Sequence, residues 1–298
     1  MRDCHLPIKR TNILSSIFSV LIDATLITLV LSLAASGLAV IFGLIGVINM
    51  GHGAMLTLGA YFTWATTTSG LHFFPAVLIS ALGVGAIGLI LEHFLIRHFY
   101  KNPFETLLLT WGFFLVSTEV IKIIFGTDFR SVVSPLPGTF NLFGIDVPAY
   151  RALVACLSLI LLIAIGAIYK KTSFGLRIRA LVQNQEVASL LGQDIALLYK
   201  QIFFLGSFLS GLAGALISPM LSIDPYIGNV YLVRSFFVVT LGGLGSLVQG
   251  TMLGSFVIGG SETIFALSTS QGFAQTIVFV VAVILLRLFP RGILAGRT

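Results

Sequence analysis

The sequence predicts an all-α polytopic membrane protein, and three observations support this fold class. Of the 298 residues, 57% are hydrophobic and only 9% are charged, whereas a typical soluble domain is about 25% charged. The mean hydropathy is +1.04. Several apolar runs reach the length of roughly 20 residues that a helix needs to cross a hydrocarbon core. Because no stretch is polar enough to fold separately in water, residues 1–298 are expected to form one transmembrane domain.

About eight membrane segments are expected from these apolar runs. Their predicted bounds are 14–36, 37–69, 74–96, 104–125, 150–170, 199–222, 232–270 and 272–289. The first segment follows a basic stretch, but its apolar run continues far beyond the apolar core of a signal peptide, which is about 7–15 residues long. We therefore interpret it as a retained membrane helix.

Basic residues predict the orientation of these segments. Lys and Arg cluster within 2–10, 97–101, 170–179 and 287–297, with one more at Lys200, and such clusters mark the cytoplasmic ends of membrane helices. This rule places both termini in the cytoplasm. Segments 37–69 and 232–270 must then each begin and end outside, which a broken or re-entrant segment can do and a simple span cannot. The alternative is one ordinary, kinked span in each case.

Each of these two segments has a glycine-rich centre. The first centre contains Asn49 and His52, and the second contains Gly243 and Gly245. A backbone break in lipid leaves N–H and C=O groups unsatisfied, so breaks occur only where protein buries them or where they line a water-filled path. Paired interruptions of this kind indicate a transport pathway, and we predict that these four residues belong to it.

The side chains of Asn49 and His52 are the leading candidates for contact with a transported solute. Each can donate and accept a hydrogen bond, which suits a small polar molecule, although capping of the neighbouring half-helices is an equally open role. Thr110 and Trp111 interrupt another apolar run and join the predicted pathway, with helix packing as the alternative. No metal, nucleotide or nucleophile signature is present, so we expect no metal, no cofactor and no enzymatic activity.

Two polar segments interrupt the apolar pattern. Residues 126–149 hold three of the nine prolines and mixed charges, which predicts an external loop. Residues 172–192 are basic and helix-forming, with Thr172 at a helix start and Gly192 at a helix end, and predict a cytoplasmic helix. Within them, 185–191 is amphipathic. Such a helix suits either a pocket of another protein or an anionic lipid surface.

Three blocks of the chain resemble the membrane permeases of branched-chain amino acid and urea ABC importers. The blocks are 43–53 with 58–61, then 172–180 with 183–184, and finally 224–228 with 238–246. They follow the order of the family and cover nearly the whole chain. Residues 49–50, 109–112 and 225–228 are most similar to the urea-type permease.

The resemblance implies a permease subunit of an ATP-driven importer in the bacterial inner membrane, with urea or a short amide as the substrate. Ala54 and Arg234 depart from this pattern, because the family generally has an acid at the first position and the urea-type members have one at the second. Import of a branched-chain or other neutral amino acid is therefore the alternative.

The resemblance also implies partners: a homologous second permease, two cytosolic ATPases and a periplasmic solute-binding protein, with no nucleic acid. The ATPases are expected to dock on the segment 172–192, through Arg177, Arg179, Gln183, Asn184, Glu186 and Gly192. A stand-alone channel or ion-coupled carrier is the alternative from another class. Such a protein needs acidic residues within the membrane, and these are scarce here.

Overall fold

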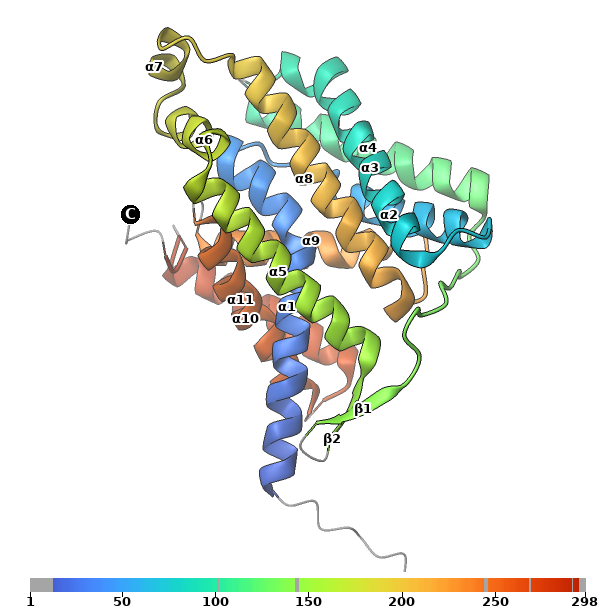
Figure 1. Cartoon of the computed structure of the whole chain (residues 1–298). Helices are drawn as coiled ribbons and strands as arrows, with labels where there is room; N and C mark the ends of the chain where they lie inside the picture. Colours follow the sequence, from blue (N-terminus) through green and yellow to red (C-terminus); the bar gives the residue numbers. More distant parts are fainter. Residues whose placement is uncertain are drawn as a thin grey trace, which may run out of the picture.

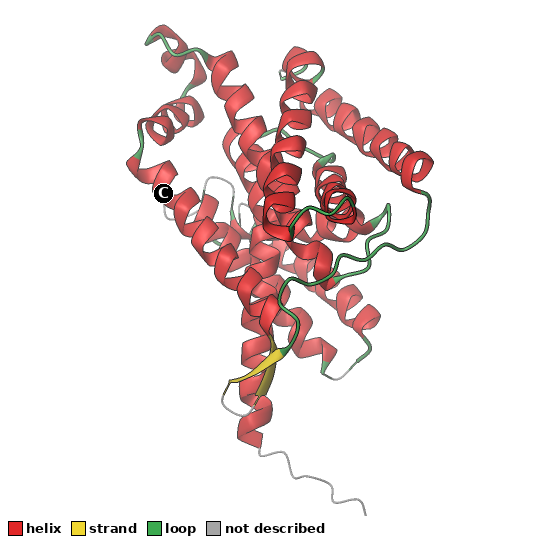
Figure 2. Ribbon diagram, turned by 45° about the vertical axis from the view of Figure 1, so that its right-hand side comes forward, coloured by secondary structure: helices red, strands yellow, loops and turns green. Residues whose placement is uncertain are grey.

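The computed structural model describes residues 13–100, 102–142, 145–243, 246–267, 269–290 and 292–294. Nearly all of its regular structure is helical (Figure 2). The α-helices are α1 (Ile13–Ile45), α2 (His52–Thr68), α3 (Phe73–Phe94), α4 (Pro103–Phe125), α5 (Ala149–Lys171), α6 (Ser173–Gln183), α7 (Gln185–Leu190), α8 (Ile195–Ile217), α9 (Ile227–Gly242), α10 (Leu247–Ala266) and α11 (Gln271–Leu288), with the 3₁₀ turns η1 (Ile96–His98) and η2 (Ser218–Met220).

The predicted all-α membrane fold is confirmed. Five helices are long and apolar enough to cross a bilayer: Phe18–Ile45, Phe73–His98, Pro103–Phe125, Ala149–Lys171 and Ile195–Met220. Helices α9 and α10 form a further apolar pair, bent by 117° at the break between them. Because α2 and α11 are shorter than these spans, the predicted number of eight segments is only approximate.

The bundle has two distinct ends (Figure 1). One end carries α6 and α7, and we call it the coupling side; the other carries the strands β1 (Thr139–Leu142) and β2 (Ile145–Pro148), and we call it the hairpin side. Helix α5 runs from the hairpin side to the coupling side, and α8 returns. Helix α1 is antiparallel to α8, since Gly37 faces Ser210 while Ile41 faces Gly206.

The first break in the apolar helices lies where it is predicted, but the segment before it differs from the expectation. Helix α1 continues through the predicted boundary at 36–37 to Ile45. Gly37 lies within this helix, and its lack of a side chain allows close packing against the backbone of α8. The chain then turns at Gly46, which has a φ of 74°, and α2 begins at His52. The boundary predicted at 36–37 is therefore wrong.

This continuous helix changes the orientation of the first segments. Asp23 of α1 pairs with Arg151 at the start of α5, with 3.3 Å between Oδ1 and Nη1, so α1 begins on the hairpin side. The chain after α11 ends on the coupling side, where the Ile293 N–H donates to the Leu241 carbonyl. The two ends of the described chain thus lie at opposite ends of the bundle. The expectation that both termini are cytoplasmic stays a prediction, because the basic stretch 2–10 lies outside the described residues.

The second break joins α9 to α10. The helices are antiparallel, with Gly242 packed on Gly250 and Gly254 packed on Val238, and both have their outer ends on the hairpin side. The break predicted within 232–270 is therefore present, and that this segment begins and ends on one side of the membrane stays a prediction. Gly243 ends α9 with a φ of 98°, in the left-handed region that favours glycine. Gly245 lies outside the described residues.

The predicted external loop 126–149 contains more structure than the sequence indicated. Strands β1 and β2 pair antiparallel, from Thr139 opposite Pro148 to Leu142 opposite Ile145. Earlier in the loop, Arg130 forms an isolated bridge with Ile223, which ties this segment to the chain between η2 and α9. The loop therefore covers the hairpin side of the bundle.

Candidate functional site

The first break, residues 46–51, is held by hydrogen bonds from side chains. The Gly51 N–H donates to Oδ1 of Asn49 at 3.0 Å, and the Met50 N–H donates to Oγ1 of Thr110 at 3.1 Å. Asn49 is 1% exposed and Thr110 is fully buried. Both predicted pathway residues therefore satisfy backbone groups that the break would otherwise leave unpaired.

The imidazole of His52 is fully buried at the start of α2. Its Nδ1 lies 2.9 Å from Oγ of Ser210 on α8, and the same hydroxyl donates to the Gly206 carbonyl at 2.8 Å. This polar cluster fixes the inner end of α2 to the middle of α8. The structure thus brings Asn49, His52 and Thr110 together around one break. Asn49 and Thr110 each accept a hydrogen bond from a backbone N–H of the break, a role that the sequence analysis left open for Asn49 and did not predict for Thr110.

Replacing Thr110 with valine tests whether the Thr110 hydroxyl stabilises the break by accepting the Met50 N–H. The Met50 N–H would lose its acceptor in a buried site, which is expected to cost about 1–3 kcal/mol of unfolding free energy and to lower the melting temperature of the detergent-purified protein. Thr118→Val is the matched control, because the Thr118 hydroxyl bonds only to the Phe114 carbonyl of its own helix. Equal melting temperatures for the two variants would show that Thr110 does not support the break.

Trp111 lies apart from this cluster. Its side chain is 42% exposed on the outside of the bundle, and its ring stacks on Phe114 with 5.5 Å between the ring centroids. Because successive residues of a helix point about 100° apart, a buried Thr110 leaves its neighbour directed outward. Gly243 also lies elsewhere, beside Gly43 and Ser246, in a crevice of about 10 Å³ that is too small for a solute.

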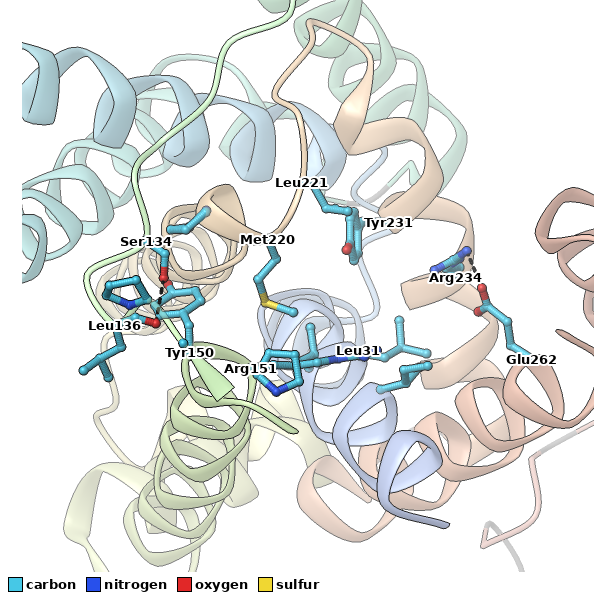
Figure 3. A pocket seen from close by; sticks show the side chains of 16 residues that line it. Leu31, Ser134, Leu136, Tyr150, Arg151, Met220, Leu221, Tyr231, Arg234 and Glu262 are labelled. Carbon is cyan, nitrogen blue, oxygen red and sulfur yellow. Dashed lines mark hydrogen bonds and ion pairs between the residues drawn. The ribbon is translucent and has the colours of Figure 1, made fainter. Parts of the chain in front are cut away.

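A larger cavity, which we call the hairpin-side cavity, lies between α1, α5, η2, α9 and α10, with a volume of about 560 Å³ (Figure 3). Arg234 and Glu262 meet on its wall, with 2.8 Å between Nη2 and Oε1. The sequence analysis did not include this pair in the pathway. The available signal was the presence of two opposite charges in one apolar segment, because charges within membrane segments usually pair.

The coupling segment, residues 172–192, folds as two short capped helices. The hydroxyl of Thr172 accepts the Gly175 N–H at 3.1 Å at the start of α6. Oδ1 of Asn184 accepts the N–H groups of Glu186 and Val187 at 3.0 and 3.1 Å at the start of α7. Gly192, with a φ of 81°, ends the segment. The helix start and end predicted from the sequence are both present.

The residues predicted to dock an ATPase differ in their surroundings. Arg179 donates from Nη1 to the Tyr169 carbonyl, and its guanidinium lies 5.5 Å from the centroid of the Tyr169 ring, so it fixes α6 to the end of α5. The side chains of Arg177, Gln183 and Glu186 are exposed. Beside them, the α7 tip exposes three apolar side chains: Val187, Leu190 and Leu191.

Comparison with known proteins gives a consistent result. Residues 19–287 match the family model described as "Branched-chain amino acid transport system / permease component". The high-affinity branched-chain amino acid transport system permease protein LivH of Salmonella typhimurium is 24% identical over 290 residues, covering 89% of this chain and 91% of its own. Its counterpart BraD of Pseudomonas aeruginosa is 23% identical over 282 residues, with the same coverage.

A third relative is named for a different substrate, ribose. The ribose import permease protein RbsC of Haemophilus influenzae is 28% identical over 255 residues, covering 81% of this chain and 77% of its own. No solved structure matches the chain. None of these three relatives is named for urea, so the urea-type specificity expected from the motifs receives no support. Since the family model spans most of the sequence, this chain belongs to the family of branched-chain amino acid transport system permease components.

Proposed function

We propose that this protein is the permease subunit of an ABC importer for a branched-chain or similar neutral amino acid. The observation that carries the proposal is the coupling segment, a capped pair of short helices that projects an apolar tip from one end of an otherwise apolar bundle. The names of the relatives support the substrate class, because LivH and BraD are both named for branched-chain amino acid transport.

In this proposal the coupling side faces the cytoplasm and the hairpin side faces the periplasm. A solute-binding protein delivers the amino acid to the hairpin side, and a second permease completes the pathway. Two ATPases bind the α7 tips of the two permeases, and ATP binding shifts the pair between outward-facing and inward-facing states. Hydrolysis takes place on those separate subunits, so the chain itself acts as a transport subunit and not as an enzyme.

The alternative of an ion-coupled carrier would depend on the buried carboxylates. Within the described residues these are Glu92 and Glu262. Glu92 accepts a hydrogen bond from the hydroxyl of Tyr100 at 2.9 Å. Burial raises the pKa of Tyr100, and the nearby charge of Glu92 raises it further, so the phenol stays protonated and remains a donor. Glu262 pairs with Arg234. The charge of Glu262 is thus balanced by Arg234, and Oε2 of Glu92 is the buried carboxylate oxygen without a partner among the described residues; a carrier would use such a group for its coupling ion.

Uptake into proteoliposomes tests the proposed function. The complex of this chain with its second permease and ATPases is reconstituted with the binding protein encoded beside it, and uptake of labelled leucine, urea and ribose is measured. We expect ATP-dependent leucine uptake that valine and isoleucine inhibit and urea does not. ATP-dependent uptake of urea or ribose alone would overturn the substrate class, and ATP-independent uptake by the chain alone would favour a channel or carrier.

A further inference from the structure

The hairpin-side cavity has the size and the enclosure of a small-molecule site. Its volume of about 560 Å³ falls within the range of about 300–1,000 Å³ that is typical of ligand pockets. Six separate stretches of the chain contribute to its wall, and Figure 3 shows their side chains surrounding a common space. It lies on the side of the bundle opposite the coupling segment, where a delivered solute would enter.

The cavity wall carries Arg234 and Glu262 in direct contact, and it also includes Arg151, which pairs with Asp23 of α1. The side chains of Arg234 and Glu262 are only 13% and 9% exposed. Their ion pair joins one nitrogen, Nη2, to one oxygen, Oε1, so the remaining guanidinium N–H groups and the second carboxylate oxygen are left for a ligand. A ligand that matches both charges at this spacing must itself carry a carboxylate and an ammonium group close together.

The remainder of the wall combines polar side chains, including Arg151 and Tyr231, with an apolar part. Ile27, Leu31, Met220 and Leu221 form this apolar part, and the close-up shows the Met220 side chain pointing into the cavity (Figure 3). A surface of this kind favours an aliphatic side chain, because burial of each methylene contributes about 0.8 kcal/mol. The wall therefore combines the two features of a branched-chain amino acid, which are a zwitterionic end and an aliphatic end.

We propose that the hairpin-side cavity binds a neutral amino acid as its zwitterion, with the α-carboxylate at Arg234, the α-ammonium at Glu262 and the aliphatic side chain against α1 and η2. This assignment rests on the proposed function for the class of substrate. The proposed site belongs to the permease itself and is separate from the site of a solute-binding protein.

A purely structural ion pair between α9 and α10 is the competing explanation. A buried pair of this kind is often replaced by neutral residues without loss of stability, whereas removal of one partner alone is strongly destabilising. Stability by itself therefore does not separate the two explanations. A comparison of ligands that carry different charges separates them, because only a pair that contacts the ligand determines which charges the ligand must carry.

Equilibrium binding to the purified permease–ATPase complex, without the binding protein, tests the site. The probes are L-leucine, isoamylamine, which lacks the carboxylate, and 4-methylpentanoate, which lacks the ammonium group. Arg234→Gln and Glu262→Gln are each expected to weaken leucine binding by about 10- to 100-fold, as expected for loss of one charge-assisted hydrogen bond. Arg234→Gln should also shift the preference toward the amine, and Glu262→Gln should shift it toward the carboxylate.

Two controls keep this test decisive. The double variant Arg234→Gln/Glu262→Gln leaves no unpaired charge, and it is expected to retain assembly with the ATPase while leucine binding stays weak. Lys122→Gln removes an ion pair with Glu119 on the hairpin side, outside the cavity, and leucine binding should not change. If the double variant restores wild-type leucine binding, or if the analogue preference does not shift in the single variants, the pair is structural and the proposal is overturned.

The two proposals fail in different ways. Leucine uptake by the wild-type complex together with unchanged analogue selectivity in the variants would overturn the cavity assignment alone. Charge-dependent leucine binding in the cavity without ATP-dependent leucine uptake would overturn the proposed function and leave the cavity assignment standing.

Discussion

Replacing Gly214 with leucine is expected to abolish accumulation of the folded protein in the membrane. Gly214 of α8 lies directly against the backbone of α2, and a Cβ atom there would overlap the Leu56 carbonyl. One turn away, a Cβ on Gly59 would in turn overlap the backbone of Gly211. Helices in a membrane associate mainly through such close packing of small residues, so a leucine at this crossing would separate α2 from α8.

The expected loss of stability in Gly214→Leu is large because of the contacts at the α2–α8 crossing. Overpacking in a core costs about 1–3 kcal/mol and occasionally more, and here the obstacle is backbone, which adjusts less than a side chain. Separation of the helices would also break the contact between His52 and Ser210. Size-exclusion chromatography of detergent-solubilised protein, detected by a fluorescent fusion, should show loss of the monodisperse peak.

Gly112→Leu provides the matched control. Gly112 is also a helical glycine of an apolar helix, α4, but a Cβ at this position meets no atom within 4 Å. We expect this variant to give a peak like that of the wild-type protein. Equal peaks for Gly112→Leu and Gly214→Leu would show that the α2–α8 crossing tolerates a larger separation than the structure indicates.

The double change Leu190→Glu/Leu191→Glu is expected to abolish ATP-driven transport while the protein remains folded. The two side chains are 87% and 75% exposed, so their replacement removes little buried apolar surface from the folded chain. If the α7 tip inserts into a pocket of an ATPase, two carboxylates there would be desolvated without partners, which costs several kcal/mol for each ion. Co-purification of the ATPase and ATP-dependent leucine uptake should both be lost.

The control for this change is Phe129→Glu. Phe129 is 76% exposed but lies in the loop on the hairpin side, so ATPase co-purification should be unaffected. Retention of the ATPase by the α7 variant would contradict the docking proposal and would favour the alternative in which the segment lies on the lipid surface.

The sequence predicted those features that depend on local signals. The first break was located correctly because glycines and polar residues interrupt an apolar run between Ile45 and His52. The coupling helices were predicted because Thr172 and Gly192 have the cap preferences of helix ends. These residues act on backbone groups within a few positions of themselves, so no knowledge of the tertiary structure is needed.

Features that depend on distant contacts were missed. The boundary predicted at 36–37 was wrong because the helix continues through Gly37, which packs against α8, more than 160 positions later in the chain. The hairpin-side cavity was missed for a related reason, because its wall combines α1, the loop before β1 and the α9–α10 pair, and no local pattern brings these together.

The candidate site was predicted only in part. Thr110 and Trp111 are adjacent in sequence and were grouped for that reason, but the helix directs the first into the bundle and the second out of it. In the coupling segment, Asn184 and Gly192 determine the shape of the chain, whereas the side chains of Arg177 and Glu186 are exposed. Composition can identify such a segment, but only the fold distinguishes its exposed side chains from the residues that hold its backbone in shape.

The contacts of α2 also have a consequence for biosynthesis. His52 pairs with Ser210, 158 residues later, and Thr57 accepts the Gly228 N–H, 171 residues later. At a synthesis rate of about 5–20 residues per second, the ribosome needs about 8–30 s to supply these partners. During this time α2, a short helix with a polar start, lacks its packing partners in the bilayer. Nascent chains released before α8 is complete should therefore be preferred targets of membrane proteases and insertion chaperones.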